Sequence, residues 1–292
     1  MSRPPQVANI PGPITPARRP HTRFPANATD CHAHVFGPWP RYGVVEGAAY
    51  VPPDNVLDDY VTMLGTIGCG RGVLVQPSVY GIDNRAIVDA IAANVVPLRG
   101  IAVVAPDVSD RELERLHAAG FRGIRINIHS ATRGLSLADA PSLAARIKPL
   151  GWHLQFYADL RANPEACDVI AKLPIDCVLD HFLKVPAAGG VESPAFRSLL
   201  DLLRHDHVWA KLMGPYFISD ERGFGDTTPL ARAMVKVAPD RLLWGTDWPH
   251  PGAREKMTDD GDLADLLAQW VPDESVRNRI LVDNPARLYD FR

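Results

Sequence analysis

Short apolar runs alternate with longer amphipathic stretches along the chain from residue 29 onward. The apolar runs are rich in β-forming residues and predict strands. They lie at residues 29–36, 71–76, 98–104, 122–128, 152–157, 175–181, 208–213 and 241–247. The amphipathic stretches predict helices. They lie near residues 56–67, 85–94, 110–119, 141–150, 162–172, 194–204, 229–237 and 262–270.

The stretch RELERLHAAG illustrates the basis of the helix predictions. Leu113 and Leu116 fall on one helical face, while charged residues spread over the other. Ser109 or Asp110 is a suitable N-cap, and Gly120 is a suitable C-cap. The apolar period and both end signals therefore indicate the same helix.

Eight strands that are each followed by a helix favour a closed parallel barrel of the α/β class. Parallel neighbours need a crossover connection, and the helices then cover the outside of the barrel. A doubly wound open sheet is the alternative, but it normally carries a Gly-rich turn after its first strand. Here that position holds His-Ala-His followed by Val-Phe-Gly-Pro. We therefore expect a (β/α)8 TIM barrel that spans residues 28–292 as one domain.

The first 27 residues differ from the rest of the chain. They hold seven of its 27 prolines and show no apolar period. They also lack the apolar core of a secretory signal. We expect residues 1–27 to form a Pro-rich extended arm over the barrel or over a neighbouring subunit, with a disordered tail as the alternative.

Composition narrows the classes of partner. The chain has 292 residues, with 31 Lys and Arg against 34 Asp and Glu, and 46% of its residues are hydrophobic. These values exclude a disordered chain. No apolar run approaches the roughly 18 residues of a membrane helix, and the charge balance offers no footprint for nucleic acid. We therefore expect neither a membrane nor a nucleic-acid partner, and a homo-oligomer remains open.

Cysteine usage bears on the compartment. The chain has four cysteines, none of which forms a CxxC pair. That number is too small for a disulfide scaffold in a chain of this length. We expect reduced thiols in a cytoplasmic protein.

Polar side chains gather where the predicted strands end, which is where barrel enzymes build their sites. His32 and His34 stand two apart on the first strand and therefore share one side of it. His181 ends the sixth strand, and Asp247 ends the eighth. Burying three imidazoles and a carboxylate without a function would cost free energy, so we interpret them as one site. Other residues at the predicted rim are Ser78, Tyr80, Arg125, Asn127, Tyr157, Lys211 and His250.

The remaining histidines receive a structural interpretation. A single histidine in an apolar strand is more often a packing residue than a ligand. His153 opens the fifth strand, at the barrel end away from the site. His129 directly follows the fourth strand and is the one further histidine that could approach the substrate.

The segments DCHAHVFGP, VLVQPSVYGIDN, GIRINI, GWHLQFY, VLDHF and LLWGTDWPHP together resemble the amidohydrolase superfamily. Within it, the chain is most similar to the 2-pyrone-4,6-dicarboxylate lactonases and related lactone hydrolases. The resemblance runs from about residue 28 to the NPARLY segment near the C-terminus. It implies a hydrolase that opens the ring of a small carboxylated lactone. A lactone isomerase, a metal-dependent amidohydrolase or decarboxylase on the same scaffold, and a non-enzymatic binding protein are the alternatives.

The resemblance leaves two possibilities for a metal. Metal-dependent members of the superfamily carry a bridging Lys or Glu on the fourth strand, where this chain has Arg125 and Asn127. An Arg beside the histidine pair opposes a divalent cation. The lactonases work without metal, so we expect no cofactor. The alternative is one zinc ion held by residues from the set His32, His34, His181 and Asp247.

The implied reaction assigns roles to these residues. Asp247 is the predicted general base, and His32, His34 and His181 are the predicted donors that polarise the lactone carbonyl. Arg125 is the predicted carboxylate anchor. Its predicted partners in substrate binding are Tyr157, Ser78, Tyr80, Asn127, Lys211 and His250.

Two departures from the dicarboxylate lactonases concern the substrate. Those proteins carry a second Arg soon after the one that matches Arg125, where this chain offers Arg133 only if the loop is shifted. They also have Gly-Arg after the sixth-strand histidine, where this chain has Phe182, Leu183 and Lys184. A lysine cannot grip a carboxylate with two parallel bonds. We expect a substrate with fewer or differently placed carboxylates.

Overall fold

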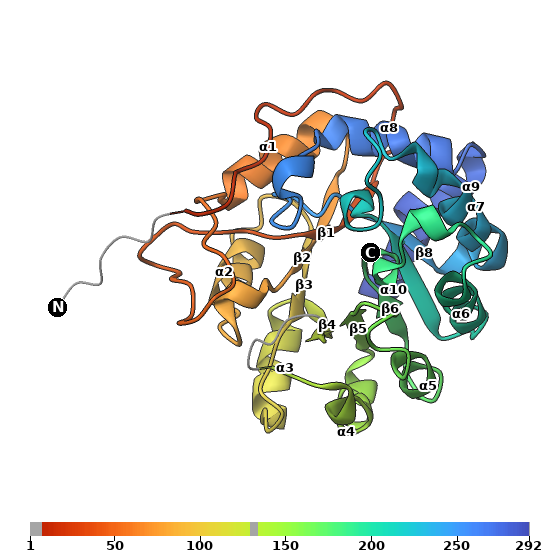
Figure 1. Cartoon of the computed structure of the whole chain (residues 1–292). Coiled ribbons are helices and arrows are strands. Elements are labelled where there is room, and N and C mark those ends of the chain that lie inside the picture. Colours follow the sequence, from red (N-terminus) through yellow and green to blue (C-terminus); the bar gives the residue numbers. More distant parts are fainter. Residues whose placement is uncertain (1–7, 129–133, 292) are drawn as a thin grey trace.

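The computed structural model describes residues 8–128 and 134–291. Within them, eight parallel strands follow one another in the order β1 to β8 around a barrel, with helices outside (Figure 1). This confirms the predicted (β/α)8 fold. The strands are β1 (Thr29–Ala33), β2 (Arg71–Val75), β3 (Leu98–Ala102), β4 (Phe121–Asn127), β5 (His153–Tyr157), β6 (Cys177–Leu179), β7 (Val208–Leu212) and β8 (Leu242–Trp244).

The seam between β8 and β1 is closed by backbone hydrogen bonds just beyond β8. The Asp247 amide donates to the His32 carbonyl over 2.8 Å, and the His34 amide donates to the Trp248 carbonyl over 2.7 Å. The seam is therefore made by the candidate site residues themselves, which ties the first strand to the last at the rim.

The helices match the amphipathic stretches and continue past the last one. They are α1 (Leu57–Ile67), α2 (Arg85–Ala92), α3 (Asp110–Ala118), α4 (Ala140–Ile147), α5 (Ala166–Ile170), α6 (Pro194–Leu203), α7 (Thr228–Val237), α8 (Asp260–Trp270), α9 (Glu274–Asn278) and α10 (Asn284–Tyr289). At α3, the Ser109 hydroxyl accepts from the Glu112 amide, and Gly120 takes a φ of +97°. Ser109 is thus the N-cap of the two candidates, and the left-handed Gly120 follows the helix end.

Most strands are shorter than predicted, and the difference bears most on the site at β6 and β8. β6 was expected to reach residue 181 and β8 residue 247, but they end at Leu179 and Trp244. His181 and Asp247 take left-handed backbone conformations, with φ of 49° and 65°. Such residues cannot continue a strand. His181 and Asp247 therefore lie just beyond their strands, whereas His32 lies on β1 and His34 directly follows it.

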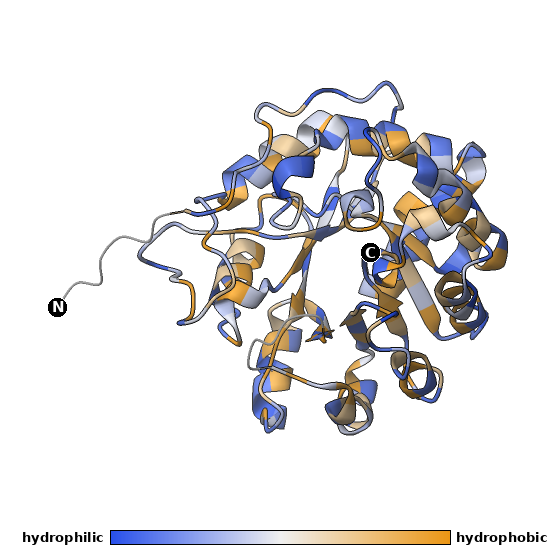
Figure 2. Ribbon diagram, in the orientation of Figure 1, coloured by the Kyte–Doolittle hydropathy of each residue, from blue (hydrophilic) through white to orange (hydrophobic). Residues whose placement is uncertain are grey.

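Apolar side chains form two buried clusters around the strands. Figure 2 colours parts of the barrel strands orange, the colour of hydrophobic residues. One cluster packs between strands and helices. A second cluster fills the barrel interior and includes Cys31, Val73, Val75, Ile101, Val178, Trp209 and Leu243. It continues into Tyr289 and Phe291 near the C-terminus. The Tyr289 carbonyl accepts from Arg99 near the start of β3, so this segment closes the amino-terminal end of the barrel.

Residues 8–28 contain no helix or strand and lie against the barrel. Arg18 pairs with Asp262 and Asp265 on α8 at 2.7 and 2.6 Å. The Phe24 ring meets the Trp244 ring edge-on, with 5.1 Å between centroids. The division of the chain into an arm at residues 1–27 and a barrel at 28–292 stays a prediction.

The described residues also show the state of the cysteines and the character of the helices. All four cysteines are free thiols, and three of them are buried. None of the helices in the described part of the chain has the length and apolar character needed to cross a lipid bilayer.

Candidate active site

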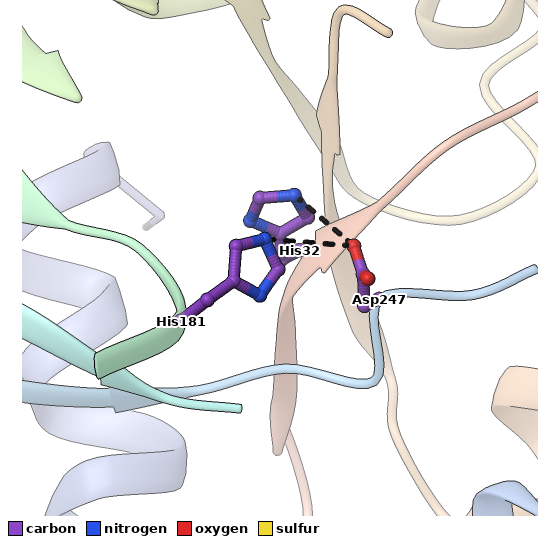
Figure 3. A group of neighbouring side chains, drawn as sticks. All are labelled: His32, His181 and Asp247. Carbon is purple, nitrogen blue, oxygen red and sulfur yellow. Dashed lines mark ion pairs between the residues drawn. The ribbon is translucent and has the colours of Figure 1, made fainter. Parts of the chain in front are cut away.

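Asp247 lies at the centre of a buried cluster at the carboxyl ends of the strands. Its Oδ1 is 3.5 Å from Nε2 of His32, 3.4 Å from Nε2 of His34 and 4.0 Å from Nε2 of His181. Its other oxygen, Oδ2, accepts a 2.5 Å hydrogen bond from the Tyr216 hydroxyl. Figure 3 shows the rings of His32 and His181 turned toward Asp247. The structure thus brings the four predicted catalytic residues together.

A bulge in β1 turns its side chains toward different partners. The pairing of β1 with β2 shifts register between Asp30 and Ala33. Bulges next to active sites commonly re-aim a side chain. Here Asp30 points to the hydroxyls of Tyr60 and Thr246, while His32 points into the barrel.

Asp30 braces the seam behind the cluster. Its oxygens accept from the backbone amides of His32 and Thr246 and from the side chains of Thr246 and Tyr60, over 2.8 to 3.1 Å. Burial nevertheless raises the pKa of Asp30 to about 6. This carboxyl ties β1 to the segment after β8, and so holds His32 at a set distance from Asp247.

The segment that carries His181 has a strained backbone. His181, Phe182, Leu183 and Lys184 all take φ values between 47° and 54°. Left-handed conformations cost about 1–2 kcal/mol for each non-glycine residue. Gly214 follows β7 and packs so close to the His181 ring that a Cβ there would lie 2.4 Å from Nδ1. Strain of this kind is common where surrounding structure holds a functional side chain in place.

Electrostatics keep Asp247 ionised and the imidazoles of His32 and His181 neutral. Burial alone would raise the pKa of Asp247, but His181, the hydrogen bond from His34, and His32 outweigh it and hold this pKa far below its ordinary value. Burial lowers the pKa of His181 to about 4. Burial and the neighbouring Lys211 lower the pKa of His32. At neutral pH Asp247 is therefore a carboxylate that faces the neutral rings of His32 and His181.

A polar layer lies beneath His32, inside the barrel. Lys211 on β7 is fully buried, and its Nζ is 3.1 Å from Nδ1 of His32 and 2.8 Å from Oε1 of Gln155. The Gln155 amide donates to Oδ2 of Asp180 over 2.9 Å, and Nε of Arg125 lies 3.3 Å from the same oxygen. Lys211, predicted at the rim, thus lies below it.

The predicted substrate contacts separate into two groups. Arg125 lies over the Tyr157 ring, with 4.9 Å between Cζ and the centroid. Arg125, Ser78 and Asn127 line a common small pocket. The Tyr80 hydroxyl instead accepts from the Gly37 amide over 2.8 Å. His250 is buried, with Nε2 3.1 Å from Oδ1 of Asp260, so neither Tyr80 nor His250 directs a polar atom into this pocket.

Several residues of the site were not predicted. Tyr216, Asp180 and Gln155 contact the predicted residues directly. Tyr50 hydrogen-bonds Ser78, and burial raises the pKa of Tyr50 above its ordinary value. The Phe217 ring packs against His181 with 4.6 Å between centroids. A sequence signal existed for Asp180, which precedes His181, and for Tyr216, which follows the seventh strand.

Two sequence candidates cannot be placed. His129 and Arg133, considered above as further substrate contacts, lie outside the described residues.

The possible metal ligands of this site have a spacing close to that of a zinc site but unsuitable hydrogen bonds. Among the described residues, His32, His181 and Asp247 form one group whose ligand atoms lie within 4.8 Å of one another. Two ligands of one tetrahedral zinc are about 3.3 Å apart, so the spacing is close to suitable. The hydrogen bonding is not suitable. A metal-bound histidine donates its second N–H to an acceptor, whereas Nδ1 of His32 faces the Lys211 ammonium, which carries only donors. The residues therefore do not fit a resident metal while Lys211 is charged.

A (β/α)8 barrel with a carboxylate and imidazoles at its carboxyl end defines a class of hydrolytic enzymes. The amidohydrolase family model matches residues 29–291, and the chain belongs to this family. It is 37% identical to the 2-pyrone-4,6-dicarboxylate hydrolase of Comamonas testosteroni, over 93% of this chain and 92% of that protein. It is 38% identical to the 4-sulfomuconolactone hydrolase of Rhizobium radiobacter, over 94% and 96%.

A solved structure supports the same placement. It is that of a probable 2-pyrone-4,6-dicarboxylic acid hydrolase from Acinetobacter baumannii with citric acid bound. The TM-score is 0.79 at 29% identity, over 91% of this chain and all of that one. The predicted resemblance to the amidohydrolases is thereby confirmed.

Proposed function

We propose that this enzyme hydrolyses a small lactone that carries carboxylate, with Asp247 as the general base. The observation that carries the proposal is that the two carboxylate oxygens of Asp247 have different partners. One oxygen is held by Tyr216, and the other faces three imidazole nitrogens within 4.0 Å. The two curated relatives described above are named as lactone hydrolases, which supports the same reaction class.

His32 on β1 and His34 just after it have different roles in this mechanism. Nδ1 of His34 is 2.7 Å from the Val75 carbonyl, which can only accept, so Nδ1 carries a proton. Nε2 of His34 lies 3.4 Å from Oδ1 of Asp247, beside the proposed base. We therefore assign His34 to the nucleophilic water, while the sequence had placed it among the donors to the carbonyl.

The bond changes follow from these positions. Asp247 takes one proton from the water while the water oxygen bonds to the lactone carbonyl carbon. His32 and His181 stabilise the developing oxyanion, which typically contributes about 10²–10³ in kcat for each donor. Collapse of the intermediate breaks the acyl–oxygen bond, and the proton held by Asp247 passes to the ring oxygen.

Arg125 is the carboxylate anchor of this proposal. Its Nε pairs with Asp180, and its guanidinium stacks on Tyr157. A planar guanidinium fixed on both sides can present its remaining donors in a set direction. Nζ of Lys184 lies 5.3 Å from the same Tyr157 ring and adds a second positive charge nearby. Because Lys184 is a point charge, we expect a preference for lactones with fewer or differently placed carboxylates than the pyrone dicarboxylate.

The decisive experiment is an assay of purified enzyme on a lactone panel, with mono- and dicarboxylate rings side by side. Ring opening with uptake of one water is expected for at least one carboxylated lactone. An isomeric product without water uptake would show a lactone isomerase instead. A clear preference for the pyrone dicarboxylate would overturn the proposed difference in substrate.

Metal independence is part of the proposal, because the Lys211–His32 contact disfavours His32 as a ligand. Elemental analysis of the purified enzyme, with activity measured before and after chelation, tests it. Unchanged turnover after chelation is expected. One tightly bound zinc per chain that turnover requires would establish the metal-dependent alternative.

A further inference from the structure

We propose that Lys211 is a positioning residue that keeps the proton of neutral His32 on Nε2, so that His32 enters catalysis as an N–H donor. The tautomer follows from contacts alone. Its catalytic consequence rests on the proposed lactone hydrolysis. Lys211 itself is too deeply buried to reach substrate, since its side chain is 0% exposed.

The first step is the environment of the Lys211 ammonium. Three potential acceptors surround its three N–H groups: Nδ1 of His32 at 3.1 Å, Oε1 of Gln155 at 2.8 Å and Oδ1 of Asp180 at 3.5 Å. The Gln155 amide group is oriented by its own bond to Asp180, so its carbonyl must face Lys211. Each of these three groups therefore faces Lys211 with an atom that can accept a hydrogen bond.

The second step concerns the ring. An ammonium has no lone pair, so Nδ1 of His32 must be the acceptor in this contact. A neutral imidazole with an acceptor at Nδ1 carries its proton at Nε2. That nitrogen lies 3.5 Å from Oδ1 of Asp247, on the side where substrate would bind. His34 has the opposite arrangement, because its Nδ1 donates to the Val75 carbonyl.

The third step is the competing arrangement. Oδ1 of Asp180 lies 3.4 Å from Nδ1 of His32. Without Lys211, this carboxylate would become the natural acceptor for an Nδ1 proton, and Nε2 would turn a lone pair toward Asp247. That is the ring orientation of a metal ligand with a carboxylate partner. Lys211 thus selects between a donor histidine and a ligand histidine on the same backbone.

The direct test is the tautomer of His32 in ¹⁵N-histidine-labelled enzyme, measured by long-range proton–nitrogen correlation and assigned with a His32→Gln sample. The wild type is expected to show Nε2 protonated. Lys211→Met is expected to move the proton to Nδ1. Gln155→Met removes another contact of Lys211 in the same buried layer and is expected to leave the tautomer unchanged. An Nδ1 proton in the wild type, or an unchanged tautomer in Lys211→Met, overturns the proposal.

Two further readouts separate this role from simple structural support. Lys211→Met is expected to take up about one zinc per chain after dialysis, while wild type and Gln155→Met do not. Its kcat is expected to fall about 10²–10³-fold, with a much smaller change in KM. If the tautomer moves but kcat does not, the positioning role stands and the proposed hydrolytic role of His32 fails. If Lys211→Met does not fold, the wild-type tautomer still decides.

Discussion

The Tyr216 hydroxyl donates a 2.5 Å hydrogen bond to Oδ2 of Asp247, the oxygen that faces away from the histidines. Tyr216 is buried, and burial together with Asp247 raises its pKa, so it remains a donor at all working pH values. The carboxylate is therefore fixed by one oxygen and left to react through the other.

Tyr216→Phe is expected to lower kcat about 10–100-fold, because a hydrogen bond to a charged group is worth about 1.5–3 kcal/mol. KM should change little, since the hydroxyl contacts the base. The matched control is Tyr60→Phe, which removes a buried hydroxyl from Asp30 on the far side of β1. That control should lower thermal stability more than kcat. Equal effects of both variants on kcat would contradict the assignment.

Asp247→Asn is expected to lower kcat about 10²–10⁴-fold, the range that positioned general bases contribute. The change preserves the shape of the side chain, so circular dichroism should show an intact fold. Asp201→Asn on the exposed face of α6 should behave like the wild type. Near-normal kcat in Asp247→Asn would mean that another group is the base.

Arg125→Lys is expected to raise KM about 10-fold or more for carboxylated lactones, because the two-pronged grip is lost while the charge beside Asp180 is kept. Steady-state kinetics on the best substrate of the panel measures it. Arg122→Lys is the control, since Arg122 is on the same strand but pairs with Asp290. An unchanged KM in Arg125→Lys would remove Arg125 as the anchor.

His153→Leu is expected to flatten the acid dependence of stability. Burial lowers the pKa of His153 to about 3, below the value of about 6.5 in an unfolded chain. As pH falls below about 6.5, the unfolded state therefore binds this proton first and is favoured. Between pH 7 and 4 the wild type should lose about 3 kcal/mol of unfolding free energy that His153→Leu retains.

Urea unfolding at pH 7, 5.5 and 4 measures this difference. His205→Leu changes an exposed histidine in the turn before β7 and should keep the wild-type dependence. The His153 ring meets the Tyr289 ring edge-on at the amino-terminal end of the barrel, so kcat should stay unchanged in the variant. Identical pH dependence in wild type and His153→Leu would contradict the burial argument.

The predictions that succeeded from sequence rest on local periodicity and on one topological rule. Apolar runs and amphipathic stretches alternate as in a (β/α)8 barrel, and parallel strands place their carboxyl ends on one face. This was enough to predict that His32, His34, His181 and Asp247 share one site. The His–x–His spacing on one strand and the Asp-His pair on another carried most of this information.

The sequence by itself determined which strands exist and which residues lie near their ends. Only the tertiary structure decided how deep each of these side chains lies in the barrel and where it points. Lys211 lies beneath His32 inside the barrel, and the Tyr80 hydroxyl accepts from the Gly37 amide instead of facing the pocket. Left-handed backbone at His181 and Asp247 placed them beyond their strands. The proton positions on the histidines depend on Lys211 of β7, Gln155 of β5 and Val75 of β2, and no local pattern in the chain records those contacts.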